Sequence, residues 1–193
     1  MGFLLAGGKS SRMGADKAFL KLDGRTLLET SLRVLSEACG GVTIVGDPAK
    51  LEKYGRVVAD VYAGCGPLAG IHTALEHSST ELNVMLAVDM PFVSAKLLSF
   101  LLGKAEKSDA AVTVPRMGRG LQPLCAVYRQ AFAPIAQQAL EAGKYKIDAA
   151  FAGVNVQVVD EPELTAAGFS GRNFLNVNTP EDWRAAEGVS FQP

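Results

Sequence analysis

Long apolar runs and blocks of like charge are both missing from this chain of 193 residues. Its 19 basic and 20 acidic side chains almost cancel, and no basic stripe of the kind that nucleic-acid-binding domains carry is visible. No apolar run approaches the ~20 residues that a membrane-spanning helix needs. We therefore expect neither a nucleic-acid partner nor a membrane partner.

Cysteine is also scarce, since only Cys39, Cys65 and Cys125 are present. They are odd in number, lie far apart and form no CxxC pair, which argues against a disulfide framework and against a zinc site. Free cysteines are typical of a reducing compartment, and the chain shows no signal-peptide pattern ahead of its first apolar segment. We expect a cytoplasmic protein.

Short apolar segments alternating with helical stretches are what the chain does contain. The pattern predicts strands at Gly2–Ala6, Val42–Gly46, Arg56–Asp60, Asn83–Phe92, Asp109–Pro115, Gln122–Arg129, Val154–Asp160 and Phe174–Asn178. It predicts helices at Thr26–Ala38, after Pro48, and at Gly66–His77, Ser94–Ala105, Ala131–Ala142 and Thr179–Glu187.

This alternation is typical of an α/β fold with three layers, in which helices cover both faces of a mostly parallel, Rossmann-like sheet. We expect one domain over residues 1–193. In such sheets ligands bind beyond the carboxyl ends of the strands. The loop after Ala6, Asp60 and Asp89 are therefore expected at one edge of the sheet.

The stretch "LLAGGKSSRMGADK" (residues 4–17) combines three glycines with Lys9, Arg12 and Lys17. Glycines allow the backbone to approach a ligand closely, and successive free amides form an anion-binding concavity. Arg12 can clamp a phosphate through two parallel bonds, while Lys17 acts as a point charge. The alternative is a flexible turn with solvated cations.

Neither of the two familiar phosphate loops matches this stretch. A Walker A loop that ends at Gly8-Lys9-Ser10 needs glycine at position 3, which is Phe3. The dinucleotide pattern G-x-G-x-x-G is also absent, because the spacing here is G-G-x-x-x-x-x-G.

A third pattern does fit. "LAGGKSSRMGADK" is similar to the nucleotidyltransferase signature L-A-x-G-x-x-x-R-M-x-x-x-K, and its second glycine and final Asp-Lys resemble the molybdenum cofactor guanylyltransferases. Three more segments resemble that family: "GPLAGI" (66–71), "VDMPF" (88–92) and "NVNTPED" (176–182). The four motifs run from residue 4 to residue 182, so the resemblance spans almost the whole chain.

The resemblance implies a nucleotide-diphospho-sugar transferase-like fold and a magnesium-dependent enzyme that transfers GMP from GTP to molybdopterin or Mo-molybdopterin and releases pyrophosphate. Possible further partners are cofactor-insertion proteins and apo-molybdoenzymes. Catalysis would fall to Lys17, Arg12 and Asp89. The nucleotide would meet Leu5, Ala6, Gly7, Gly8, Lys17, Asp60, Gly66, Gly70 and Asp89, and the acceptor would meet Gln122, Asn176 and Asn178.

Three of these residues have competing explanations. Asp60 ends a predicted strand and could instead be a residue of a surface turn. Asp89 follows an apolar strand, and Mg²⁺ in proteins prefers one or two carboxylates plus phosphate oxygens and water. A lone aspartate there could also be an ordinary loop or N-cap residue. Asn178 shares a strand face with Asn176 in the predicted strand, but it could instead start the turn into the last helix.

Three rival functions remain open. Cytidylyltransferases of the same fold tend to read L-A-A-G and to have Gln after the strand-end Asp, whereas this chain reads "LAGG" and has Met90. Sugar-phosphate nucleotidyltransferases usually carry Pro-Lys in place of Asp16-Lys17. A non-catalytic GTP-binding module is the third. One departure from the guanylyltransferases is "IVGD" (44–47), where that family often has asparagine at the end of the second central strand.

Overall fold

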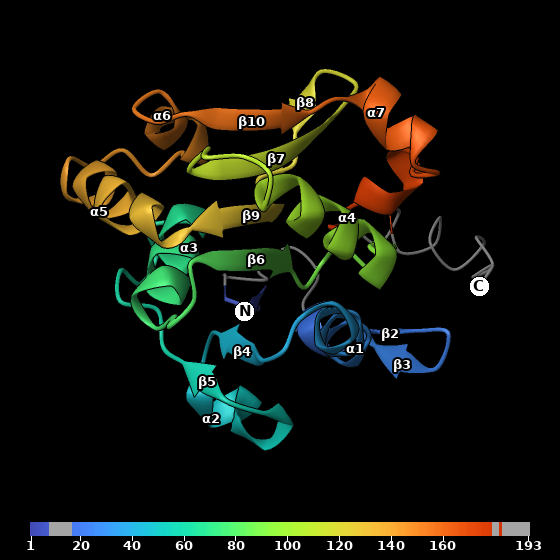
Figure 1. Ribbon diagram of the computed structural model, residues 1–193. Helices are drawn as coiled ribbons and strands as arrows, with labels where there is room; N and C mark the ends of the chain where they lie inside the picture. The colour runs from blue at the N-terminus through green and yellow to red at the C-terminus, as the bar shows by residue number, and fades with distance from the viewer. Residues whose placement is uncertain (8–16, 179–181, 183–193) are drawn as a thin grey trace.

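The computed structural model describes residues 1–7, 17–178 and 182. Its main sheet has eight strands in the order β10–β7–β9–β6–β1–β4–β5, and β8 pairs with β7 (Figure 1). The strands are β1 Gly2–Leu5, β4 Val42–Val45, β5 Val57–Val58, β6 Leu82–Ala87, β7 Val112–Met117, β8 Gly120–Leu121, β9 Cys125–Arg129 and β10 Val156–Val159. A separate two-stranded sheet pairs β2 (Lys21–Leu22) with β3 (Arg25–Thr26).

The main sheet is mostly parallel, which confirms the predicted fold class. β1 pairs in parallel with both β4 and β6, β4 with β5, and β10 with β7. β9 runs antiparallel to both β6 and β7, and β8 is antiparallel to β7. The carboxyl ends of β1, β4 and β6 therefore meet at one edge of the sheet.

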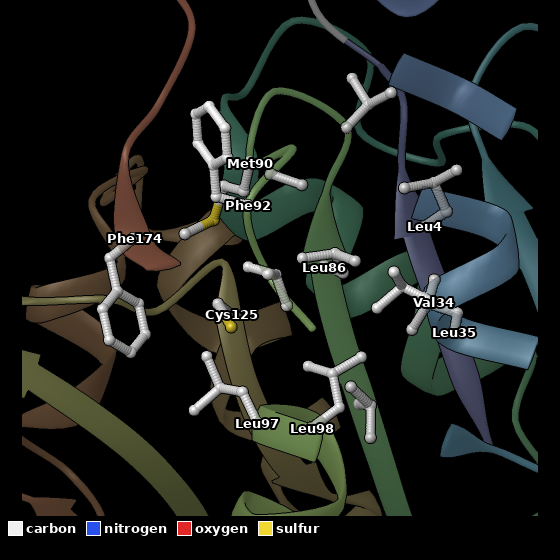
Figure 2. Close-up of a cluster of buried hydrophobic side chains, with 14 of the residues drawn as sticks. Leu4, Val34, Leu35, Leu86, Met90, Phe92, Leu97, Leu98, Cys125 and Phe174 are labelled. Atoms are coloured by element: carbon white, nitrogen blue, oxygen red, sulfur yellow. The ribbon is translucent and has the colours of Figure 1, made fainter. Parts of the chain in front are cut away.

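Helices cover the two faces of this sheet and build a separate core on each (Figure 1). One face is covered by α1 (Leu27–Ala38), α4 (Ala95–Ala105) and α7 (Glu161–Ala166), and the other by α3 (Pro67–Glu76), α5 (Ala133–Glu141) and α6 (Ile147–Phe151). The short helices are α2 (Pro48–Leu51), η1 (Lys17–Phe19), η2 (Glu52–Tyr54), η3 (Gln130–Phe132) and η4 (Gly171–Phe174). Figure 2 shows the first core, in which Leu4 of β1 and Leu86 of β6 lie with side chains of α1 and α4.

Local signals explain where the helices that frame the site begin. Thr26 caps α1 through a capping box with Glu29, whose amide donates to the threonine hydroxyl at 3.1 Å. The Ser94 hydroxyl accepts from the amide of Leu97 and caps α4. Pro67 occupies the first turn of α3, where a missing amide hydrogen has no consequence.

The structure corrects several predicted boundaries. β6 ends at Ala87, so Asp89 lies in a turn two residues beyond the strand instead of closing it. The predicted strand Phe174–Asn178 is wrong: Phe174 ends η4, and the backbone bond that the segment from 175 to 178 makes to a distant part of the chain runs from the amide of Val177 to the carbonyl of Asp89. The predicted helix Thr179–Glu187 lies outside the described residues, except for Asp182.

Several elements have no counterpart among the predictions. The hairpin β2–β3 turns through Asp23 and Gly24, both with positive φ, as an Asp-Gly turn favours. The helices α6 and α7 were also missed, because each is too short to show a helical period. Within the part of the chain that the structure describes, no helix has the length and apolar character needed to cross a bilayer.

Candidate active site

A cavity of about 310 Å³ opens where the ends of β1, β4 and β6 meet the start of α3. Most of its wall is apolar side chains and glycine backbone, and its charged side chains are Lys17, Asp60 and Asp89. Among the described residues, the lining is Leu5, Ala6, Gly7, Lys17, Ala18, Val45, Asp60, Gly64, Gly66, Pro67, Gly70, Ala87, Val88, Asp89 and Leu124. An apolar cleft with a few placed charges is typical of a small-molecule site.

The end of β1 forms the base of this cavity. The amide of Ala6 donates to the carbonyl of Val45 at 2.9 Å, and the amide of Val88 donates to the carbonyl of Leu5 at 3.2 Å. These bonds hold the chain in line with the sheet until it leaves at Gly7, which is exposed. The sequence-predicted residues Gly8 and Arg12 lie outside the described part of the chain.

Lys17 is held between two segments that are distant in sequence. Its Nζ donates a 2.7 Å hydrogen bond to Oδ1 of Asn178 and lies 3.8 Å from Oδ2 of Asp89. The side chains of Lys17 and Asp89 are only 19% and 24% exposed, so their charges are poorly screened by solvent. The structure thus brings together three residues that belong to three different motifs.

The turn that carries Asp89 is anchored on both sides. Met90 and Phe92 are buried in the first core, where Figure 2 draws them in one cluster with Phe174. The amide of Val177 donates to the Asp89 carbonyl at 2.8 Å, and the Asn173 side chain donates to the carbonyl of Phe92. Burial raises the pKa of the Asp89 carboxyl, while the nearby Lys17 ammonium opposes that shift. A half-buried carboxylate in this position has lost part of its hydration and is therefore a good partner for a cation.

Asp60 also lines the cavity and lies in the loop between β5 and α3. Its Oδ1 accepts two hydrogen bonds of 3.2 Å, one from the amide of Tyr62 and one from the hydroxyl of Thr73. That hydroxyl also accepts from the amide of Val61 at 3.0 Å. A fully buried residue of α3 therefore ties down the loop that presents Asp60.

Glycines shape the wall where this loop enters α3. Gly64 and Gly66 have φ values of 83° and 78°, which residues other than glycine rarely adopt. A Cβ at Gly66 would lie 3.8 Å from the carbonyl oxygen of Tyr145, so space is not the constraint and backbone conformation is. Gly70 lies one turn into α3, where its hypothetical Cβ would be in ordinary contact with Leu5.

The three predicted acceptor residues lie in different surroundings. Asn178 contacts Lys17, and its own amide donates to Oδ2 of Asp182 at 2.9 Å. Asn176 is exposed and lies outside the cavity lining. Gln122 is half-buried before β9, its backbone amide donates to the carbonyl of Pro115, and it is not among the residues that line the cavity. Sequence reasoning missed the lining residues Val45 and Leu124, whose only signal was a place next to a strand end.

The structure leaves little room for a side chain at Gly46 of "IVGD" unless Leu51 shifts. A Cβ at Gly46 would lie 2.7 Å from Cδ1 of Leu51 and 3.4 Å from the carbonyl carbon of Ala6. A larger residue there would push against α2 and against the end of β1. Asp47 does not replace the missing asparagine, because its side chain caps α2 by accepting from the amide of Ala49 at 3.1 Å.

Asp89 suits a magnesium ion that also binds phosphate. Among residues 1–7, 17–178 and 182, no group of three or more His, Cys, Asp or Glu side chains could hold a metal by itself. Mg²⁺ does not need such a group, because it usually takes one or two carboxylates and completes its shell with phosphate oxygens and water. One half-buried carboxylate at the cavity wall fits that donor set.

Comparisons with known proteins agree with the resemblance that the four sequence motifs indicated. The family model of the MobA-like NTP transferase domain matches residues 2–156. A probable molybdenum cofactor guanylyltransferase of Pelotomaculum thermopropionicum is 38% identical over 186 residues, covering 94% of this chain and 88% of the relative. The crystal structure of molybdopterin-guanine dinucleotide biosynthesis protein A from Archaeoglobus fulgidus superposes with a TM-score of 0.84 at 30% identity, covering 97% of this chain and 96% of that one.

A more distant match concerns the fold alone. The 2-C-methyl-D-erythritol 4-phosphate cytidylyltransferase of Thermus thermophilus superposes with a TM-score of 0.72 at 22% identity, over 96% of each chain. The same sheet and helices therefore serve transferases that use another nucleotide, and base specificity has to come from the site.

Proposed function

Because the chain belongs to the family of MobA-like NTP transferase domains and is a nucleotidyltransferase, we propose that it transfers GMP from GTP to molybdopterin or Mo-molybdopterin. The products are the guanine dinucleotide form of the cofactor and pyrophosphate. The observation that carries the proposal is the meeting of Lys17 and Asp89, 3.8 Å apart, at the wall of a cavity built from strand ends and the start of α3.

The reaction needs no protein nucleophile. A phosphate oxygen of molybdopterin attacks the α-phosphorus of GTP, a new P–O bond forms, and the bond between the α-phosphorus and its bridging oxygen breaks. Pyrophosphate leaves with that electron pair. The protein has to align the two phosphates and to offset the negative charge that develops between them.

Lys17 is the described residue best placed for that charge. Its ammonium sits at the cavity wall, largely out of solvent, and Asn178 and Asp89 restrict where it can point. A preorganised cation in a water-poor site stabilises developing charge without having to reorient during the reaction. Arg12, outside the described residues, is proposed to hold the leaving pyrophosphate.

Asp89 would hold Mg²⁺, which when bound supplies positive charge next to the phosphates. The peptide groups of Leu5, Ala6 and Gly7 lie at the cavity and would contact the nucleotide, and so would Asp60, Gly66 and Gly70 on the side of α3. Gly8 is proposed to continue the same contact. Asn178 and, beyond the cavity, Asn176 and Gln122 would face the acceptor.

The proposal extends to the domain organisation, the cellular location and the recipients of the product. We propose that residues 1–193 work as one nucleotidyltransferase domain in the cytoplasm. Because the product is a cofactor for other enzymes, cofactor-insertion proteins and apo-molybdoenzymes are the proposed recipients.

Nucleotide-dependent pyrophosphate release tests the proposal. Purified protein, Mg²⁺ and molybdopterin are mixed in turn with GTP, CTP, ATP and UTP, and pyrophosphate is measured. We expect release with GTP alone. Release with CTP alone would reassign the base and favour the cytidylyl alternative, and GTP binding without release from any nucleotide would favour a non-catalytic binding module.

A further inference from the structure

Asp60 lines the cavity, and its carboxylate is hydrogen-bonded to a residue of α3. Among the described residues, both hydrogen bonds to its side chain end on Oδ1, from the Tyr62 amide and the Thr73 hydroxyl. A carboxylate has about four lone-pair sites on its two oxygens. With Oδ1 engaged by the protein, Oδ2 is the oxygen left to accept from a ligand.

The donor and acceptor roles of the Thr73 hydroxyl can be assigned from its two partners. A hydroxyl has one proton to donate, and the Thr73 oxygen already accepts from the amide of Val61 at 3.0 Å. The direction of that incoming bond leaves the hydroxyl proton to be given to Asp60 Oδ1, at 3.2 Å. Thr73 itself has no exposed surface.

The tie also spans two elements. Thr73 lies in α3, while Val61 and Asp60 lie in the loop before it, twelve and thirteen residues earlier. This loop continues to Gly64 and Gly66, which also line the cavity. One side of the cavity is therefore tied to α3 through a buried hydroxyl.

We propose that Thr73 is a positioning residue that holds the Asp60 carboxylate in the orientation that accepts hydrogen bonds from the bound nucleotide. The inference rests on the proposed function, in which Asp60 contacts the nucleotide. Thr73 itself does not line the cavity and acts only through Asp60 and the loop.

Two substitutions at Thr73 separate the effect of the hydroxyl from the effect of the side-chain shape. Thr73→Val keeps the branched shape and removes both hydrogen bonds, whereas Thr73→Ser keeps the hydroxyl. Val61 is 58% exposed, so its freed amide can turn to water and the fold should tolerate the valine. Thermal unfolding of each variant reports whether α3 has been damaged.

The binding constant for GTP with Mg²⁺ is measured by calorimetry without acceptor, and kcat and KM are measured by pyrophosphate release. We expect Thr73→Val to weaken GTP binding and raise its KM by about tenfold, the usual worth of a hydrogen bond near a charged group, with kcat close to wild type. Thr73→Ser should restore the wild-type constants.

A double-mutant cycle with Asp60→Ala, which removes the acceptor oxygen, supplies the decisive comparison. If Thr73 acts through Asp60, adding Thr73→Val to Asp60→Ala changes GTP affinity no further. Unchanged affinity in Thr73→Val, or a loss that is the same in both backgrounds, would overturn the inference and leave the proposed function intact. Wild-type protein that binds no nucleotide at all would instead overturn the proposed function.

Discussion

The ammonium of Lys17 donates a 2.7 Å hydrogen bond to the side-chain oxygen of Asn178, which lies 161 positions further along the chain. The same ammonium lies 3.8 Å from Asp89. Through this contact the segment after η4 reaches the cavity and takes part in placing the cation. The backbone bond from Val177 to Asp89 reinforces that link.

Removing the Lys17 ammonium should nearly abolish turnover. We expect Lys17→Ala to lower kcat by about 10³-fold, in line with the loss of a preorganised group that stabilises transition-state charge. Lys21→Ala is the matched control, because Lys21 is an exposed lysine on β2 and should leave the rate unchanged. Pyrophosphate release measures both variants, and near wild-type turnover by Lys17→Ala would remove Lys17 from its proposed role.

Removing the Asn178 side chain should have a smaller effect that acts through Lys17. We expect Asn178→Ala to lower kcat by about 10- to 100-fold, because a hydrogen bond to a charged group is lost. Asn155→Ala is its control: Asn155 is an exposed asparagine just before β10 and does not line the cavity, so kcat should stay near wild type. Equal losses in the two variants would show that the bond to Lys17 is not what matters at Asn178.

Neutralising Asp89 should separate activity from stability. Asp89→Asn should abolish turnover and any increase in melting temperature that Mg²⁺ plus GTP produces in the wild type. In EDTA the variant should be at least as stable as the wild type, because burial disfavours the charged carboxyl and raises its pKa. Scanning calorimetry with and without metal makes the measurement, and an Asp89→Asn protein still stabilised by Mg²⁺ with GTP would place the metal elsewhere.

Gly66 should resist even a methyl group. Gly66→Ala forces a side chain onto a φ of 78°, and we expect a loss of about 1–3 kcal/mol in the free energy of unfolding together with weaker GTP binding. Gly103→Ala is the contrasting control, since Gly103 lies within α4 and a Cβ there meets nothing within 4 Å. That variant should gain about 0.5–1 kcal/mol, because alanine favours a helix over glycine. Urea unfolding of both variants measures whether the free energy of unfolding falls or rises. The same change in both variants would refute the conformational argument.

The capping box of α1 should make stability depend on pH in a defined direction. Hydrogen bonds from the backbone and hydroxyl of Thr26 lower the pKa of Glu29. A lowered folded-state pKa stabilises the protein above the unfolded-state pKa, and that contribution is lost as pH falls through the folded-state value. Glu29→Gln should therefore melt at a lower temperature than wild type at pH 7, and the difference should shrink under acidic conditions below the ordinary range of a glutamate. A difference that stays constant with pH would assign the effect to packing.

The sequence alone was sufficient for the features that depend on local chemistry. Alternating apolar segments predicted the three-layer α/β fold, and Thr26, Pro67 and Ser94 marked helix starts because a cap acts within one turn. The order and spacing of four motifs predicted the family, which the match over residues 2–156 confirms. Asp60 and Asp89 could be placed at one edge because parallel strands end together.

Only the tertiary structure decided the features that depend on partners distant in the chain. Phe174–Asn178 has the apolar residues of a strand, but the neighbours it meets are a turn at Asp89 and the Lys17 side chain, so no strand forms. The antiparallel direction of β9, the control of Asp60 by Thr73 and the lack of room at Gly46 have the same origin. Contacts between residues that are tens of positions apart depend on which surfaces pack together in the folded chain. A local sequence pattern does not contain that information.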